Sequence, residues 1–248
     1  RRLAASADGG GIDARVVPLT LDLVESSVEC VAARRTAPLA DGGDPFSWQC
    51  NLRRYHWRAM AGMFIERAAT RGLSVCAVDA KDMRRVLSVF VSEDWKERQP
   101  RAYHYSLSTD WRPVRALFHE LHLKYKANHV GTIHEGQALH HLYFSCVHPD
   151  ARGHRLAERM WDASNQVARE RGYETVIMEA PSAAVHGVAM RLGFSEVASV
   201  RYADFMFEGQ RPFEELAHPD AKRGDTHKPG EFEALRIYER HLPSDLYV

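Results

Sequence analysis

The sequence predicts one mixed α/β (α+β) sheet with helices on both faces. Short apolar segments with the period of a strand alternate along the chain with longer segments in which apolar residues return every three or four positions. Short polar turns separate the earlier strand segments, as in antiparallel hairpins, whereas whole helices separate the later ones, as in parallel crossovers. This interleaved order is typical of a domain in which helices pack against both sides of a sheet.

The composition supports a globular domain and argues against two classes of partner. The chain has 248 residues, of which 45% are apolar, and this is enough to bury a sizeable core. Its 33 basic residues balance 33 acidic ones, so it lacks the positive surplus that a nucleic-acid binder needs. No segment approaches the roughly 18 consecutive apolar residues of a membrane span. We therefore expect neither a nucleic-acid partner nor a membrane partner.

The cysteines and the first residues bear on location. Cys30, Cys50, Cys76 and Cys146 are widely spaced and form no CxxC pair, which predicts reduced and mostly buried thiols. The first ten residues contain no apolar run of the kind found in signal peptides. We expect a cytoplasmic location, although a leader removed before Arg1 would leave no trace.

The first half of the chain predicts two helices and three strands. The first residues are small, polar and Gly-rich, which is typical of a flexible terminus. Asp22 is a suitable N-cap for the first helix, and Gly72 ends the second. The expected order is a strand at 16–21, a helix at 22–35, a loop at 36–45, a helix at 51–71, and a hairpin of strands at 73–79 and 85–91.

The second half predicts three helices and four strands. Pro113 lies in the first turn of a helix, with Asp110 before it as a cap. The expected order is a helix at 113–126, a strand at 139–147, a helix at 153–171, a strand at 175–179, a helix at 182–192, a strand at 196–207, a polar loop at 209–231 and a strand at 232–241. We divide the chain into a flexible N-terminus (1–14), a main domain (15–207) and a C-terminal extension (208–248) whose final strand packs on the same domain.

The segment from Val147 to Ala157 predicts a site for a phosphate group. A strand ends at a proline, a turn follows, and a helix begins directly after it. The start of a helix carries unpaired N–H donors and a partial positive charge, which suit a pyrophosphate. Gly153 keeps the backbone accessible, and Arg152 and Arg155 add positive charge. An ordinary strand–turn–helix with a basic turn is the alternative.

This order of elements resembles the GCN5-related N-acetyltransferase (GNAT) superfamily. The superfamily signature, Arg/Gln-x-x-Gly-x-Gly/Ala, falls on Arg152-Gly153-His154-Arg155-Leu156-Ala157, where Arg155 stands in place of the usual middle glycine. A strand and a helix follow, and the helix closes on Arg191-Leu192-Gly193-Phe194. Over about 40–207 the chain is similar to the arylalkylamine N-acetyltransferase-like branch. The branch's long helix, hairpin and acidic-Pro motif match 51–71, 72–95 and Asp44-Pro45-Phe46.

The resemblance implies how an acetyl donor is held. In this fold two central strands splay apart, and acetyl-CoA wedges between them as the co-substrate. Backbone N–H groups near Cys146 and Val147 would polarise the thioester carbonyl, as an oxyanion hole does. The amine would attack directly in a ternary complex. The pyrophosphate would lie on the amides of Arg152, Gly153, His154, Arg155, Leu156 and Ala157.

The resemblance also implies a general acid that protonates the leaving thiolate. Many family members place a tyrosine four residues before the closing glycine of the last helix. Here that position is Ala189, so the usual acid is absent. His186 lies one turn earlier on the same helix and could replace it, and Ser182 is a second polar candidate. For His186 the alternative is a histidine that only packs or faces solvent.

Three places offer a candidate general base. Asp44 is suggested by the acidic-Pro match, and Glu179 lies at a strand end, where it could instead cap the next helix. His140 and His141 are neighbours on the central strand, so one of them, which we take as His141, should face the substrate. Each of these residues could also be an ordinary packed or solvent-facing polar side chain.

We expect no metal. His119 and His122 lie three residues apart on one predicted helix and could share a face. The zinc-peptidase pattern His-Glu-x-x-His is missing, however, and no third ligand follows at a suitable spacing.

These patterns predict an N-acetyltransferase that transfers the acetyl group of acetyl-CoA to a primary amine of a small molecule. The amine would be aromatic if Phe46, Trp48, Tyr143 and Tyr202 form its walls. The alternatives are an acyltransferase that acts on a protein lysine or N-terminus or uses another acyl-CoA, and a CoA-binding sensor or scaffold with weak or no catalysis. The helix at 112–126 exceeds a minimal version of the fold and would serve either as a lid over the amine site or as a homodimer interface.

Overall fold

The computed structural model describes residues 12–129, 139–217 and 230–242, which include a seven-stranded mixed sheet. Its order is β1-β2-β3-β4-β5-β7-β6. All neighbouring strands are antiparallel except β4 and β5, which are parallel. The strands are β1 (Ala14–Pro18), β2 (Val75–Asp79), β3 (Val86–Asp94), β4 (Leu139–Val147), β5 (Thr175–Ala180), β6 (Ser195–Arg201) and β7 (Ala234–His241).

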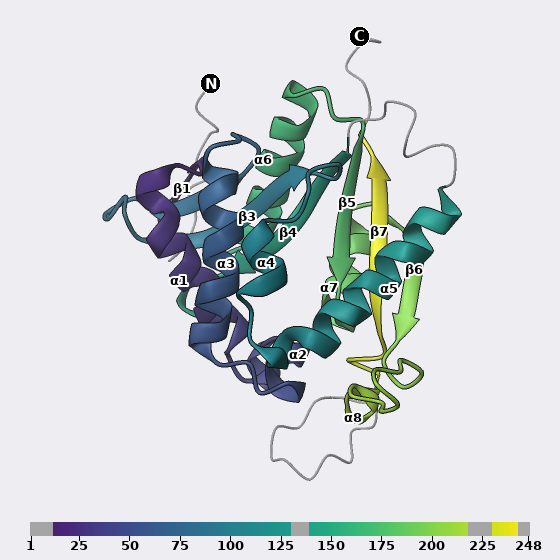
Figure 1. Cartoon of the computed structure of the whole chain (residues 1–248). Coiled ribbons are helices and arrows are strands. Elements are labelled where there is room, and N and C mark those ends of the chain that lie inside the picture. Colours follow the sequence, from purple (N-terminus) through teal and green to yellow (C-terminus); the bar gives the residue numbers. More distant parts are fainter. Residues whose placement is uncertain (1–11, 130–138, 218–229, 243–248) are drawn as a thin grey trace.

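Helices cover both faces of the sheet (Figure 1). Helices α1, α3 and α5 pack on one face, and α6 and α7 pack on the other. The predicted fold class is therefore confirmed. No helix in the described ranges is long and apolar enough to cross a lipid bilayer. The helices are α1 (Val24–Arg35), α2 (Pro45–Gln49), α3 (Arg54–Ala69), α4 (Arg101–Tyr105), α5 (Arg112–Asn128), α6 (Leu156–Glu170), α7 (Ala183–Arg191) and α8 (Glu214–Ala217).

Each face of the sheet has its own apolar core. Ile177 and Met178 are neighbours in β5, and the period of a strand sends their side chains to opposite faces. Ile177 packs with residues of α1, α3 and α5, whereas Met178 packs with residues of α6 and α7. Any residue of β5 can therefore be assigned to one face by its position in this alternation.

The observed helices and strands differ from the predicted ones in some positions and bounds. The short helices α2, α4 and α8 lie in segments for which the sequence predicts no helix. Strand β6 ends at Arg201 and not at 207, because the N–H groups of Asp204 and Phe205 turn back to the Arg201 carbonyl. The C-terminal strand β7 lies inside the sheet, between β5 and β6.

Strands β4 and β5 are paired over only part of their length. Their parallel partners run from Leu139 and Thr175 to Leu142 and Met178, where the pairing stops. At the same point the register between β3 and β4 shifts by one residue, which leaves Tyr143 without a partner in β3. A bulge of this kind bends a strand and increases its twist. Beyond Leu142 the two central strands separate.

Helix α5 crosses this opening and connects the two halves of the sheet (Figure 1). Near its C-terminal end, Asn128 Nδ2 donates to the Val197 carbonyl at 2.8 Å, and the Tyr125 hydroxyl donates to Glu239 Oε1 at 3.0 Å. At its other end, Trp111 stands edge-on to Trp57 of α3 with ring centroids 4.8 Å apart. The helix thus lies where a lid would lie, and a homodimer interface stays a prediction.

A buried ion pair fixes the start of α2 beside this opening. Arg35 Nη1 lies 2.6 Å from Asp44 Oδ2, and the Asp44 side chain has no exposed surface. Asp44 Oδ1 accepts hydrogen bonds from the N–H groups of Phe46 and Ser47, so Asp44 is the N-cap that starts α2. Burial raises the pKa of the Asp44 carboxyl, and Arg35 and the two N–H donors oppose that rise.

We expect Arg35→Met to lower the free energy of unfolding by about 3 kcal/mol, because Asp44 would stay buried without its cation. Urea unfolding followed by circular dichroism would measure the loss. The double variant Arg35→Met/Asp44→Asn is the control, because asparagine still caps α2 and leaves no buried charge. It should recover much of the loss. Equal losses in both variants would mean that packing around Arg35, and not charge, stabilises this region.

Candidate active site

A cavity of about 580 Å³ lies where β4 and β5 separate. Phe144 and Ser145 of β4 and Met178 and Glu179 of β5 line it, and α3, α4 and α5 supply most of the remaining wall. This volume falls within the range of about 300–1,000 Å³ that is usual for small-molecule sites. A larger hollow of about 790 Å³ has no lining residue from β4 or β5.

Aromatic side chains form much of the apolar wall. Phe46 meets Phe118 edge-on with ring centroids 5.7 Å apart, and Phe64 meets Phe144 at 6.1 Å. Edge-to-face pairs of this kind hold ring planes in fixed orientations, which suits a planar apolar ligand. The aromatic lining residues are Phe46, Trp57, Phe64, Tyr103, Trp111, Phe118, Phe144 and Phe207.

Only one of the four aromatic residues expected at the amine site is among these lining residues, namely Phe46. Trp48 lines the larger hollow. Tyr202 is fully buried, and its hydroxyl donates to the Pro181 carbonyl at 2.8 Å. The side chain of Tyr143 lies outside what the structure describes. The sequence therefore predicted an aromatic wall without identifying most of its members.

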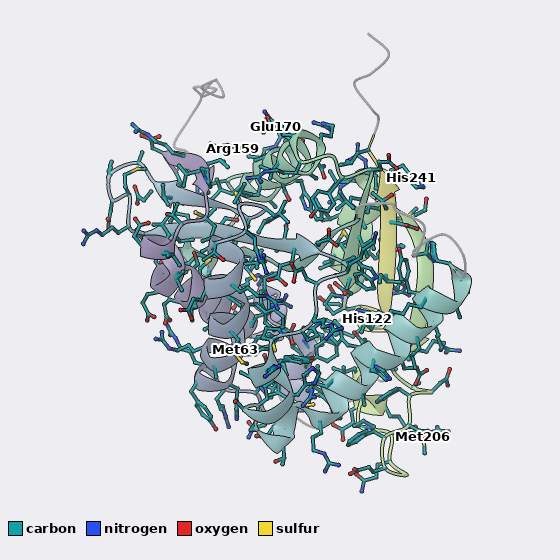
Figure 2. The ribbon with its side chains drawn as sticks, turned by 45° about the horizontal axis from the view of Figure 1, so that its top comes forward. Met63, His122, Arg159, Glu170, Met206 and His241 are labelled. Carbon is teal, nitrogen blue, oxygen red and sulfur yellow. The ribbon has the colours of Figure 1, made fainter. Side chains whose placement is uncertain are left out.

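Glu179 and His122 form a pair inside the cavity. His122 Nε2 lies 2.9 Å from Glu179 Oε1, and the Glu179 side chain is only 8% exposed. His122 projects from α5 toward the middle of the molecule (Figure 2). Its ring also stands edge-on to Trp95, with centroids 4.9 Å apart. An imidazole N–H that donates to the carboxylate fixes the orientation of the Glu179 side chain.

The backbone places Glu179 at the apex of the opening. Met178 is the last residue of β5 that pairs with β4, and Glu179 is the next residue. Because strand side chains alternate, Glu179 shares the face of Ile177, which is the face that α5 covers. The sequence left open whether Glu179 caps the helix that follows it. In the structure Ser182 is the N-cap of α7, and its Oγ accepts from the Val185 N–H at 3.4 Å.

Asp44 also lines the cavity, but its carboxylate is fully engaged. One oxygen is paired with Arg35, and the other accepts the two N–H groups at the start of α2. A base must have an oxygen that can accept a proton from the substrate. Asp44 is therefore a wall and capping residue in this arrangement.

His186 and Ser182 lie away from the Glu179–His122 pair. Neither residue lines the cavity. The His186 ring is hydrogen-bonded through Nδ1 to the Tyr238 hydroxyl, and Tyr238 belongs to the core on the α6/α7 face. Ala189, the position of the family's usual tyrosine, is fully buried in the same core. The side chain of His141 lies outside the described part of the chain, although its backbone pairs with Glu93 and Ile177.

The turn before α6 has a backbone suited to an anion. Gly153 and Arg155 both have positive φ values, of 81° and 54°. When right-handed and left-handed backbone conformations alternate along a turn, successive N–H groups point to one side and form a concave anion-binding site. The first N–H groups of α6 lack helical partners, and the described residues supply none for the amides of 153–157. The left-handed conformation at 155 explains why a glycine is usual there, and here arginine adopts it.

Most side chains of this turn contact other residues of the protein and do not gather around its backbone N–H groups. Arg155 is 81% exposed, and its Nη2 donates to Glu158 Oε2 at 2.6 Å. Arg152 donates to the Asp41 carbonyl, and His154 Nδ1 accepts from the Ile12 N–H at 3.5 Å. Leu156 is buried, and Ala157 is half-buried at the start of α6. The phosphate-binding capacity of the turn therefore depends on its backbone more than on these side chains.

The backbone of β4 also has donors that face the opening. The His148 N–H donates to the Leu87 carbonyl of β3, so alternation along the strand directs the Cys146 amide toward β3 as well. The amides of Ser145 and Val147 then point away from β3, into the opening. Of the two residues named from the sequence, Val147 thus offers its own N–H to a ligand, and Cys146 does not.

The structure also shows what the sequence did not identify. His122 entered the sequence analysis only as a doubtful metal ligand, and here it pairs with Glu179. Among the described residues there is no group of three or more His, Cys, Asp or Glu side chains that could bind a metal ion. The i, i+3 spacing of His119 and His122 indicated a shared helix face, but nothing in it indicated a carboxylate partner 57 positions away.

Known proteins resemble this chain in part of its sequence and in its fold. The model of the GNAT acetyltransferase domain family matches residues 116–206, the part from α5 to just beyond β6. No curated protein matches the sequence. Among solved structures, arylalkylamine N-acetyltransferase 2 from Aedes aegypti has a TM-score of 0.68 at 14% identity, with 93% of this chain and 100% of that chain covered.

Two further structures share the fold with the same coverage of 93% and 100%. The C-terminal condensation domain of Ebony, in complex with β-alanyl-dopamine, has a TM-score of 0.72 at 15% identity. The polyamine N-acetyltransferase of Drosophila melanogaster, which forms N-acetylagmatine, has a TM-score of 0.64 at 18% identity. At these identities the likeness shows a common fold and leaves the substrate open.

The matched segment and the fold together define the class of protein. Residues 116–206 match the GNAT acetyltransferase domain, and this domain together with the fold supports an acyltransferase. Its fold is the one found in the arylalkylamine and polyamine N-acetyltransferases of that superfamily. The family resemblance drawn from the sequence is confirmed.

Proposed function

We propose that this chain transfers the acetyl group of acetyl-CoA to the primary amine of a small aromatic molecule, with Glu179 as the general base. One observation carries the proposal. The Glu179 carboxylate stands at the point where β4 and β5 separate, inside an aromatic cavity, and His122 holds it. A positioned carboxylate next to the donor's entry between the strands is what removal of an ammonium proton requires.

Acetyl-CoA fits the residues on the donor side. The amides of 153–157 would hold its pyrophosphate, and a side chain added at Gly153 would meet no protein atom within 4 Å, so the turn is open. The N–H groups of Ser145 and Val147, which have no strand partner on the open side, would pair with its extended arm and polarise the thioester carbonyl. Acetyl-CoA supplies the acetyl group as an activated thioester.

The acceptor amine would lie in the cavity with its nitrogen at Glu179. Glu179 takes one proton from the ammonium, and the neutral nitrogen then forms a bond to the thioester carbonyl carbon. The bond from that carbon to sulfur breaks, and the second proton of the nitrogen neutralises the leaving thiolate, so that CoA departs as the thiol. His122 acts as a positioning residue, because its hydrogen bond fixes the orientation of the Glu179 carboxylate. Burial raises the pKa of the nearby Tyr103 phenol, so this cavity tyrosine stays protonated and neutral.

Direct transfer is favoured over a covalent acyl-enzyme. Cys146 is the cysteine on β4 beside the opening, but it is 1% exposed and faces the core. Burial raises the pKa of its thiol, although Arg35 and Arg34 oppose the rise. The thiolate, not the thiol, is the nucleophile, so Cys146 is poorly suited to accept the acetyl group.

The overall proposal is tested by thiol release from acetyl-CoA in the presence of primary amines that carry aromatic rings, with tryptamine and phenethylamine as the first substrates. Release that depends on the amine, together with the N-acetylated product in mass spectrometry, is expected. Tight binding of CoA in calorimetry without thiol release from any amine would favour a sensor or scaffold instead.

We expect Gly153→Asp to weaken acetyl-CoA binding by about tenfold or more, because a carboxylate would stand beside the pyrophosphate. Isothermal titration calorimetry would measure the dissociation constant. Gly153→Asn is the matched control, because asparagine has the same shape without charge and accepts a positive φ more readily than most residues. It should bind more tightly than the aspartate variant. If both variants bind as tightly as the parent, the turn does not hold the pyrophosphate.

We expect Glu179→Gln to lower kcat about 100-fold or more, because the amide keeps the shape of the side chain and cannot accept the proton. The acetyl-CoA dissociation constant should stay at the parent value. Steady-state kinetics would measure kcat, and isothermal titration calorimetry would measure the dissociation constant.

The control for this variant is His186→Gln, which removes the other candidate for proton transfer. It should leave kcat close to the parent value, because His186 is bonded to Tyr238 and does not line the cavity. A loss of kcat in His186→Gln that equals the loss in Glu179→Gln would place the proton transfer on the α7 side and contradict the assignment of Glu179.

A further inference from the structure

Arg115 is a charged side chain in the cavity wall, as Glu179 is. It lies on α5 together with His119 and His122, at helical positions i, i+4 and i+7, so the three side chains share one face. All three residues line the cavity, and Arg115 is half-buried. Seven residues along a helix span about 10 Å, so Arg115 stands about two turns away from His122, which pairs with Glu179.

The charges around the cavity are otherwise paired. Asp44 is paired with Arg35, and Glu179 lies against His122. Arg112, one turn before Arg115 on the same helix, is paired with Glu208. Each of these cations or anions therefore has its counterpart in the protein.

Arg115 differs because no carboxylate of the described residues lies within ion-pair distance of it. Its guanidinium stacks over the Tyr103 ring at 4.9 Å, and its Nη2 lies 3.4 Å from His104 Nδ1. Burial raises the pKa of the Tyr103 phenol, so the phenol brings no negative charge to the guanidinium above its ring. A guanidinium held by an aromatic ring in an apolar cavity is arranged for a planar anion, because its fork of donors matches a carboxylate.

We propose that the acceptor substrate carries a carboxylate at the end opposite its amine, and that Arg115 binds this carboxylate. This inference rests on the proposed function, because it assumes that the amine lies at Glu179. The spacing along α5 requires an apolar segment between the two charged groups, and the aromatic walls fit such a segment. An aminoalkyl-benzoate has this form, whereas an α-amino acid has both groups on one carbon.

The same charge disfavours a second cation on the substrate. A diamine with its first nitrogen at Glu179 would bring its other ammonium toward the uncompensated guanidinium of Arg115, and like charges in an apolar site repel. Arg115 would thus make this cavity discriminate against polyamines, although the Drosophila polyamine N-acetyltransferase shares its fold.

The test compares substrates that differ only in this charge. Thiol release from acetyl-CoA would be measured with 4-(2-aminoethyl)benzoate, its neutral carboxamide, phenethylamine, phenylalanine and agmatine. The benzoate should have a kcat/KM about tenfold or more above that of the carboxamide, with the difference mainly in KM. Agmatine should be poorer than phenethylamine, and phenylalanine should gain nothing over phenethylamine.

Two variants assign the effect to Arg115. Arg115→Leu should abolish the preference for the benzoate over the carboxamide. Lys124→Leu is the matched control, because it removes a positive charge from the same helix at a residue that does not line the cavity and is paired with Glu120. It should keep the preference.

The outcomes separate the inference from the proposed function. Equal kcat/KM values for benzoate and carboxamide, a preference for agmatine, or an unchanged preference in Arg115→Leu would overturn the role of Arg115. Thiol release from none of the amines would contradict acetyl transfer itself. In that case calorimetric titration of the CoA-loaded protein with 4-(2-aminoethyl)benzoate still tests Arg115, because binding of the benzoate must weaken in Arg115→Leu.

Discussion

The end of strand pairing at Leu142 and Met178 is the constraint on which the rest of this structure depends. Backbone donors and acceptors in a sheet are normally satisfied by the neighbouring strand. The bulge at Tyr143 turns β4 away from β5, so the groups of Ser145 and Val147 that would have met β5 are left for a ligand. The same separation puts Glu179 at the head of a cavity. One local irregularity thus produces both a binding edge and the space beside it.

Where two strands of a sheet separate, hydrogen bonds between them no longer fix their positions. Other contacts must then hold the two halves of the sheet together. Helix α5 does this through hydrogen bonds to β6 and β7 at one end and aromatic packing against α3 at the other. The Arg35–Asp44 pair fixes the start of α2 and so places Phe46 in the wall. The cavity is therefore bounded by elements that are far apart in sequence, and each contributes only one or two side chains.

This distribution explains which features could be predicted from the sequence. The turn at 147–157 and the elements after it form one continuous segment, so local patterns and spacing were sufficient to find them. The partner of Glu179 comes from α5, and helical periodicity shows which residues share a face without showing what they meet. The insertion of β7 between β5 and β6 is likewise a long-range pairing with no local signal. Asp44 was found by motif, but its engagement with Arg35 required the structure.

Under the proposed function, donor and acceptor would be recognised by different kinds of group, and this difference has a consequence for specificity. The donor side consists mainly of backbone N–H groups, which most residues can present, and so Arg155 can occupy a position where glycine is usual. The acceptor side consists of side chains such as Glu179, His122 and Arg115. Substitutions of these side chains can change which amine is accepted without disturbing the donor site. A shared fold at 14–18% identity is therefore compatible with different acceptor amines.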